Sequence, residues 1–459
     1  MQNYLFKQIS IVNDRNIEEK DIYIKRGHIE RIDNNINVKE NFIEIHGKDK
    51  HLFPGVIDDQ VHFREPGLTH KATIYTESKA AVAGGITSFM EMPNTIPNAL
   101  TEQLLEDKYN IARHNSLANY SFYMGTSNTN ADEVLKMNRK KKDICGVKIF
   151  MGSSTGNMLV DNEASLSKIF AESELLIATH CENEKIITEN YRRIKDAKQI
   201  LSPHDHPLIR DENACYQSSA YAVSLAKKYD SRLHILHIST EKELGLFGND
   251  VPLKDKKITA EVCVHHLHFT ADDYAELGYL IKCNPAIKEA KNKDSLWEAL
   301  LDDRLDLIAT DHAPHTWDEK QGPYEHAHSG LPLVQHSLLL MLDYYKRGKN
   351  LRAGRQLSLE KIAEKMSHAV ADCFKIADRG YIREGYFADL VVVDLNTTTQ
   401  VKKENILYKC GWSPLEEYTF PAAIIQTFVN GNCVYKREDN YGKHLFDESI
   451  KGERLSFNR

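Results

Sequence analysis

Several features that would assign a chain to a specialised class are missing from this sequence. Its eight cysteines are scattered singly over 459 residues, with no Cys-x-x-Cys pair, so we expect reduced and mostly buried thiols. No apolar run approaches the roughly 18–20 residues of a membrane span, and residues 1–15 lack the apolar core of a signal peptide. A net charge of −7 gives no basic surface for nucleic acid or an anionic membrane. These absences predict a cytoplasmic protein that binds neither.

What the chain does have is length and a regular alternation of segments. With 41% hydrophobic and 27% charged residues, it can bury a large core. Short apolar runs alternate with stretches of helical composition, which is the pattern of a (β/α)₈ barrel. The predicted strands are residues 52–57, 86–92, 118–124, 144–150, 175–179, 233–238, 257–262 and 305–310. The predicted helices are residues 70–83, 102–114, 130–140, 164–172, 212–229, 241–247 and 293–301.

Both ends of the chain have the alternating texture of β hairpins. Near the C-terminal end, Asn430-Gly431 favours a two-residue hairpin turn. We therefore predict an α/β protein of two units. Residues 1–50 and 385–459 form a composite β-sandwich, and residues 51–384 form a TIM-type (β/α)₈ barrel.

Barrels of this type carry their chemistry at the carboxyl ends of the strands, and the chemically able residues of this chain follow that rule. A single strand histidine is usually a satisfied core residue. Three histidines at one barrel mouth, with an aspartate opposite, are instead a ligand set that suits Zn²⁺. The candidates at the strand ends are His62, Arg64, Asn94, Lys148, His180, His237, Asn284, Asp311 and His315.

Lys148 stands alone among apolar neighbours in a predicted strand. A buried ammonium is costly unless it is paired or converted. One conversion is carboxylation by CO₂, which gives an anionic carbamate able to bridge two metal ions. The alternative is an ion pair with Glu182 or Asp311, and the sequence leaves both open.

Arg64 and two asparagines are candidates for holding a substrate. The guanidinium of Arg64 suits a carboxylate, although a surface salt bridge with Glu65 is the plainer interpretation. Asn94 and Asn284, taken singly, are also typical turn residues. These alternatives stay open at the level of sequence.

Three further histidine groups have metal-like spacing in less specific settings. We expect loop histidines, or histidines that lie behind the metal ligands, with the alternative that one of them supplies a missing ligand. The groups are His265/His266/His268, His326/His328 and His204/His206. The small polar loop Met151–Asn157 is a candidate substrate lid or an ordinary surface loop.

Taken together, these stretches resemble the dihydroorotases, among the cyclic amidohydrolases of the amidohydrolase superfamily. The resemblance covers nearly the whole chain, and the Arg-Glu-Pro-Gly and Asp-His-Ala-Pro-His runs are its most specific parts. They favour the dihydroorotase and allantoinase side over the hydantoinases. The matching stretches are 54–58, 61–67, 91–95, 146–148, 180–182, 237–240, 282–285, 308–315 and 385–391.

The resemblance implies a zinc-dependent, reversible cyclisation of N-carbamoyl-L-aspartate to (S)-dihydroorotate and water, in pyrimidine (UMP) biosynthesis. It implies one or two Zn²⁺ per subunit and a metal-bridging hydroxide as nucleophile, with Asp311 as general acid/base. It further implies that His62 and Asp311 bind the first metal, carboxylated Lys148 bridges, His180 and His237 bind the second, and Arg64, Asn94, Asn284 and His315 hold the substrate.

Position 60 departs from the family. Two histidines at i and i+2 of a strand point the same way and clamp a metal, but here Gln60 precedes His62 by two residues. Val264 likewise replaces the family's proline before the double histidine. An amide oxygen is a weaker zinc ligand. We expect a well-held metal at Lys148, His180 and His237, and a weaker site at His62 and Asp311 that Gln60, Asp58 or Asp59 completes.

Two alternatives remain. One is allantoinase or another cyclic-amide hydrolase. The other, which Gln60 favours, is a catalytically inactive dihydroorotase-like protein that serves as a structural partner, for example of aspartate transcarbamoylase. A homodimer is expected from the resemblance alone.

Overall fold

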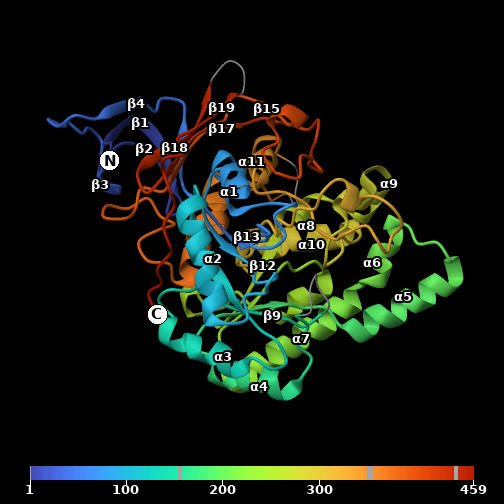
Figure 1. The fold of residues 1–459 in the computed structure, drawn as a ribbon. Coiled ribbons are helices and arrows are strands. Elements are labelled where there is room, and N and C mark those ends of the chain that lie inside the picture. Colours follow the sequence, from blue (N-terminus) through green and yellow to red (C-terminus); the bar gives the residue numbers. More distant parts are fainter. Residues whose placement is uncertain (1, 153–157, 349–354, 439–442) are drawn as a thin grey trace.

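A barrel of eight parallel strands forms the centre of the protein (Figure 1). The computed structural model describes residues 2–152, 158–348, 355–438 and 443–459. The strands pair in chain order, and the seam between the first and last closes through a bridge of Val61 with His312. At this seam the His62 amide donates to the His312 carbonyl at 2.7 Å. The barrel strands are β6 (Val56–Val61), β7 (Ile86–Glu91), β8 (Asn119–Gly125), β9 (Gly146–Phe150), β10 (Ile177–His180), β11 (Leu233–Ile235), β12 (Ile258–Cys263) and β13 (Leu307–Ala309).

The first predicted strand, residues 52–57, is two strands in the structure. The strand is interrupted at Gly55, which lies between β5 (His51–Pro54) and β6. A Cβ atom at Gly55 would lie 2.1 Å from Thr87 Oγ1, so only glycine lets the two backbones approach so closely. β5 belongs to the sheet of the chain ends rather than to the barrel.

Most predicted helices are present and begin at a capping side chain. Thr73, Thr101, Asn162 and Asp211 each accept a hydrogen bond from a first-turn amide, which satisfies a donor that the helix leaves open. Residues 241–247 form a 3₁₀ helix rather than an α-helix. The helices are α1 (Ile74–Ala83), α2 (Glu102–Asn115), α3 (Ala131–Lys136), α4 (Glu163–Glu172), α5 (Glu184–Lys198), α6 (His206–Ile209), α7 (Glu212–Tyr229), α8 (Val264–His268), α9 (Tyr274–Leu277), α10 (Ala290–Leu301), α11 (Ser337–Lys346), α12 (Leu359–Ala363) and α13 (Ala369–Phe374).

Strands from both chain ends form one nine-stranded sheet beside the barrel (Figure 1). β5 joins the two ends, because it pairs parallel with β1 and antiparallel with β14. This barrel with a separate unit of terminal strands confirms the predicted fold class, while the exact domain boundaries stay a prediction. The strands are β1 (Tyr4–Asn13), β2 (Asn16–Lys25), β3 (His28–Asp33), β4 (Ile43–His46), β14 (Leu390–Asp394), β17 (Ala423–Val429), β18 (Asn432–Glu438) and β19 (Lys443–Phe446), with a separate pair β15 (Thr399–Gln400) and β16 (Thr419–Phe420).

Among the described residues, no helix combines the length and the apolar character needed to cross a bilayer.

Candidate metal centre at the barrel mouth

One pocket at the carboxyl ends of the barrel strands gathers most of the predicted site residues. Its cavity of about 40 Å³ accommodates groups of the size of a water molecule. The lining side chains include Gln60, His62, Arg64, Lys148, His180, His237, Asn284 and Asp311. Residues up to 251 positions apart in the chain therefore meet at one point, as the barrel rule predicts.

His62 and Asp311 form one half of this pocket. His62 Nδ1 lies 2.8 Å from Asn94 Oδ1, which can only accept, so this nitrogen carries the proton. The other nitrogen, Nε2, then has a free lone pair and faces Asp311 Oδ1 at 3.2 Å. Burial lowers the pKa of His62, although Asp311 opposes the shift. Two acceptor atoms that face each other are suited to sharing a cation.

His180 and His237 form the other half. His180 Nδ1 lies 2.9 Å from His237 Nε2, and His180 Nε2 lies 3.1 Å from Glu182 Oε2. A carboxylate beside the outer nitrogen is the usual arrangement behind a metal-binding histidine, although among the described residues His180 Nε2 has no well-aligned hydrogen-bond partner. Burial lowers the pKa of both histidines, and for His237 the shift is large. In the described part of the chain, His237 Nδ1 has no hydrogen-bond partner.

Lys148 lines the same pocket, with its amine in an apolar setting. Its Nζ sits 4.5 Å from the centre of the Phe150 ring, and among the described residues no carboxylate comes within 4.0 Å of it. The alternative of an ion pair with Glu182 or Asp311 is therefore absent, and Glu182 pairs with Arg210 instead. Burial lowers the pKa of Lys148 to about 7. A neutral amine is the form that reacts with CO₂.

Arg64 is buried rather than paired with Glu65 on the surface. Its Nε donates to the Pro314 carbonyl at 3.1 Å, and its Nη2 lies 3.1 Å from His315 Nε2. Burial lowers the pKa of Arg64 to about 10, so the side chain remains a cation at neutral pH. His315 lies behind Arg64 and also contacts Lys71 Nζ at 3.1 Å.

The three residues expected to complete the first metal site have other partners. Gln60 Nε2 donates to Asp311 Oδ1 at 3.1 Å. Asp58 Oδ2 accepts from the Thr310 hydroxyl at 2.6 Å, and burial raises the pKa of Asp58 to about 7. Asp59 lies 3.4 Å from His234, below the pocket. Neither aspartate lines the pocket.

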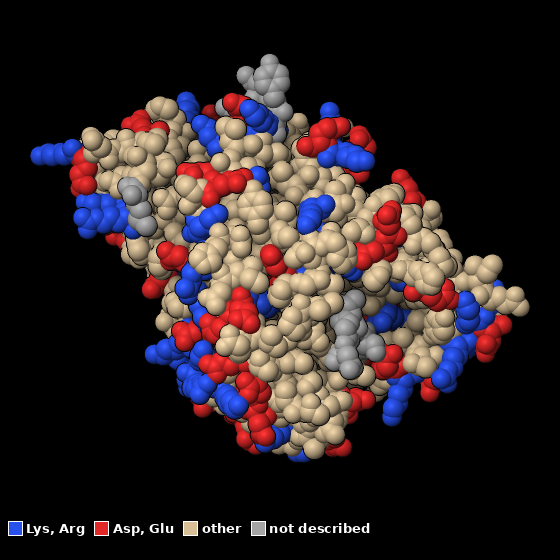
Figure 2. All heavy atoms as spheres, viewed as in Figure 1, with Lys and Arg blue, Asp and Glu red and all other residues tan. Residues whose placement is uncertain are grey.

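A larger cavity of about 400 Å³ adjoins the inner pocket, and Ser329 lines both. It lies against α5 and α6, where Figure 2 shows the surface hollowed with Lys or Arg atoms in the hollow. Asn284 links the two regions, because it lines the inner pocket and its Oδ1 lies 3.1 Å from His206 Nε2. A volume of this size is typical of a small-molecule entrance. Of the predicted lid, residues 153–157 lie outside the described residues.

The other histidine groups separate into two kinds. His204, His326 and His328 are exposed. His265 and His266 are fully buried on α8 directly after β12, so they are not loop residues, and the alternative of histidines that lie behind the metal ligands stays open. The helix is short and follows a strand without a loop, which neither periodicity nor a turn residue signals.

A buried network below the pocket was missed at the level of sequence. His234 Nε2 lies 3.0 Å from Glu261 Oε2, and Glu261 Oε1 accepts from the His237 amide at 3.2 Å. Burial alone would lower the pKa of His234. Its contacts with Asp59, Cys373 and Glu261 have the larger effect, and they raise the pKa of His234 well above the usual range. In the sequence, the only sign of this network is a polar residue within each of three barrel strands: Asp59, His234 and Glu261.

Three pocket residues have a left-handed backbone. The φ angles are +68° at Arg64, +41° at His237 and +46° at Asp311. Non-glycine residues rarely adopt such angles, at a cost of about 1–3 kcal/mol each, and they cluster at functional sites.

The donor atoms fit a divalent cation. They comprise imidazoles, a carboxylate and a lysine whose pKa burial lowers to about 7, and nitrogen and oxygen donors of this kind suit Zn²⁺. Which of these residues bind metal remains our proposal; the structure shows two close pairs, His62 with Asp311 and His180 with His237, and Lys148 in the lining of the same pocket.

Replacing Gln60 by histidine is expected to tighten the first half-site by roughly tenfold or more, because it adds an imidazole ligand at a position where the Gln60 amide only donates a hydrogen bond to Asp311. Competition with a chelator measures this, with Gln60→Asn as the control that offers no imidazole. Equal, stoichiometric occupancy of both half-sites in the natural protein would contradict the asymmetry.

Comparisons with known proteins identify the family. The Amidohydrolase family model matches residues 51–434. The chain is 31% identical over 408 residues to a dihydroorotase from Pyrococcus abyssi, covering 88% of each chain. It is 29% identical over 447 residues to an allantoinase from Desulfitobacterium hafniense, covering 95% of this chain and 97% of the relative. The solved structure of an L-hydantoinase (dihydropyrimidinase) from Arthrobacter aurescens matches with a TM-score of 0.90 at 25% identity, covering 99% and 100% of the two chains. This chain belongs to the amidohydrolase family.

Proposed function

We propose that the protein is a dihydroorotase, which interconverts N-carbamoyl-L-aspartate and (S)-dihydroorotate with loss or gain of water. The proposal rests on the pocket at the barrel mouth and on relatives named dihydroorotase. Relatives named allantoinase are similarly close, so the choice between substrates depends on the pocket itself.

The burial of Arg64 and the lack of a nearby carboxylate in the described part of the chain favour a dihydroorotase over an allantoinase. Its guanidinium is 3% exposed and lines the pocket, and among the described residues no carboxylate lies within 4.0 Å of it. A buried cation without a counter-ion favours a ligand that brings one. Dihydroorotate and carbamoyl aspartate carry a carboxylate that a guanidinium binds with two parallel hydrogen bonds, whereas allantoin has none.

The remaining residues have roles that follow from their positions. Bound Zn²⁺ would polarise the ring carbonyl and lower the pKa of water. Asp311, beside His62, would take the proton of the attacking water and pass it to the leaving ring nitrogen. In the reverse direction Asp311 returns that proton as the ring closes. Asn94 orients His62, and Glu182 orients His180.

We propose that Lys148 carries a carbamate in the active protein. The carbamate would turn a neutral amine into an anion and so add the charge that two cations require. Its formation needs the unprotonated amine, which a pKa of about 7 makes available at neutral pH. A homodimer and a contact with aspartate transcarbamoylase also stay proposals.

The test is a comparison of substrates. Purified protein, before and after removal of metal by a chelator, is assayed on carbamoyl aspartate, dihydroorotate, allantoin and hydantoin. Turnover of the first two, lost on chelation and restored by Zn²⁺, is the expected result. Activity on allantoin alone would assign an allantoinase, and a metal-replete protein inert on all four would support the inactive structural partner.

Replacing Arg64 by methionine is expected to raise KM for carbamoyl aspartate roughly 100-fold or more, because a charged hydrogen-bonding pair contributes about 3 kcal/mol. Steady-state kinetics measure the effect. The exposed Arg15 provides a control, Arg15→Met, which should leave KM unchanged. An unchanged KM in Arg64→Met would remove Arg64 from carboxylate binding.

A further inference from the structure

The hydrogen bonds around Gln60 fix the orientation of its amide. A carboxylate oxygen only accepts, so the amide nitrogen must face Asp311 Oδ1, 3.1 Å away. The amide oxygen is thereby turned away from Asp311 and lies 3.8 Å from Cys263 Sγ. The oxygen of Gln60 therefore points toward Cys263, the last residue of β12.

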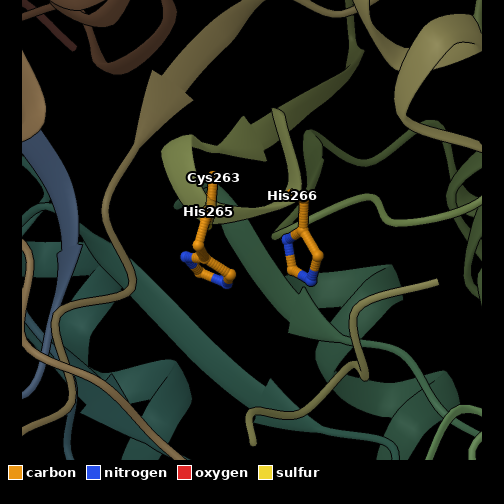
Figure 3. Close-up of side chains that lie close together, drawn as sticks. All are labelled: Cys263, His265 and His266. Carbon is orange, nitrogen blue, oxygen red and sulfur yellow. The ribbon is translucent and has the colours of Figure 1, made fainter. Parts of the chain in front are cut away.

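Cys263 belongs to a compact group of metal-ligating side chains at this place. One ligand atom from each of Cys263, His265 and His266 lies within 4.8 Å of the other two. Figure 3 shows the two imidazoles extending in the same direction from the chain, and their ring centres are 4.2 Å apart. All three residues are at most 3% exposed.

The nitrogen atoms of this group lack partners. Neither ring nitrogen of His265 forms a well-aligned hydrogen bond among the described residues, although the Thr310 backbone lies close enough to the ring to favour the protonated form. His266 Nε2 lies 3.1 Å from the Pro285 carbonyl, which only accepts, so this nitrogen carries the proton. His266 Nδ1 then has a free lone pair, and it has no partner either. Buried polar atoms without partners are rare and call for an explanation.

We propose that Cys263, His265 and His266 bind a zinc-class divalent cation, with the amide oxygen of Gln60 as the fourth ligand. Tetrahedral Zn–S and Zn–N bonds separate ligand atoms by about 3.3–3.6 Å, so separations within 4.8 Å must shorten by at most about 1.5 Å. On binding, the sulfur–metal bond replaces the S–H bond, and the thiol proton leaves to solvent. The carboxylate of Asp311 acts electrostatically on both Cys263 and His266 and offsets the remaining positive charge.

This site differs in chemistry from the centre at Lys148, His180 and His237. The proposed ligands of that centre offer only nitrogen and oxygen, whereas the new site includes a thiolate. The site also gives Gln60 a role that does not depend on dihydroorotase activity. The metal site and the proposed activity can therefore be tested separately, because metal binding at Cys263 can be measured whether or not the protein turns over dihydroorotate.

Cobalt substitution tests the site, because Co²⁺ replaces Zn²⁺ and a thiolate ligand adds a sulfur-to-cobalt charge-transfer band in the near ultraviolet. The metal-free full chain is loaded with Co²⁺, and bound metal is counted alongside the spectrum. We expect the band in the natural protein. Cys263→Ser should abolish it and lower the stoichiometry by about one ion per chain.

Two variants complete the design. Cys145→Ser changes an equally buried thiol at the other end of a barrel strand and should keep the band. His237→Asn should lower cobalt binding at the pocket, and it should also keep the charge-transfer band. His265→Gln, which should weaken the band, serves if Cys263→Ser does not fold. No band in the cobalt-loaded natural protein, or a band that survives Cys263→Ser, overturns the proposal.

Discussion

Asp311→Asn is expected to lower kcat for dihydroorotate by about 10³-fold or more, because the substitution removes both a general base and an anionic metal ligand. Asparagine has nearly the same shape, and it tolerates the left-handed backbone that Asp311 adopts at φ +46°. The fold should therefore persist, and the loss reports on chemistry. Its measurement is kcat at saturating metal, with circular dichroism to check folding.

Asp318 supplies the matched control. It is an exposed aspartate on the same loop, and Asp318→Asn should retain full activity. If Asp311→Asn kept kcat within tenfold of the natural protein, Asp311 would not be the proton carrier.

Lys148→Met is expected to lower kcat by about 10³-fold, equivalent to about 4 kcal/mol, because methionine cannot form a carbamate. The same change should stabilise the metal-free protein by about 1–4 kcal/mol, since it replaces a buried amine by an apolar chain of similar length. Activity and thermal unfolding of the two proteins measure the two effects. Loss of stability together with full activity would contradict both halves of the prediction.

The stabilisation should depend on pH. The pKa of Lys148 falls from 10.5 to about 7 on folding, so between these values the unfolded chain binds the extra proton. The stability of the natural protein therefore rises with pH through this window, and the advantage of Lys148→Met is largest below pH 7. Reactivation of metal-free protein by bicarbonate and Zn²⁺ should likewise be slower at pH 6 than at pH 8.

The sequence predicted the barrel because each buried strand is a short apolar run between helical segments. The boundary errors have a local cause: Gly55 divides a continuous apolar run, and the glycine is required by Thr87 on the next strand. α5 was missed because its composition is highly polar, with only Ile187 and Ile194 fully buried.

The pocket was predictable because barrel topology alone brings the carboxyl ends of strands together. What could not be predicted was the partner of each side chain. Asn94 contacts His62, and Gln60 turns its oxygen to Cys263, through contacts between distant segments. Hydrogen-bond orientation of this kind depends on packing, and composition and spacing do not encode it.

The position of the barrel seam implies that the two halves of the pocket form at different stages of folding. Lys148 and His180 lie on β9 and β10, and His237 follows the next strand, β11, whereas Gln60 and Asp311 are 251 residues apart and meet only where β6 joins β13. Contacts between such distant segments form late, since closing a long loop costs more entropy. We therefore expect the contact between His180 and His237 to form earlier in folding than the contacts at His62, which need the last barrel strand.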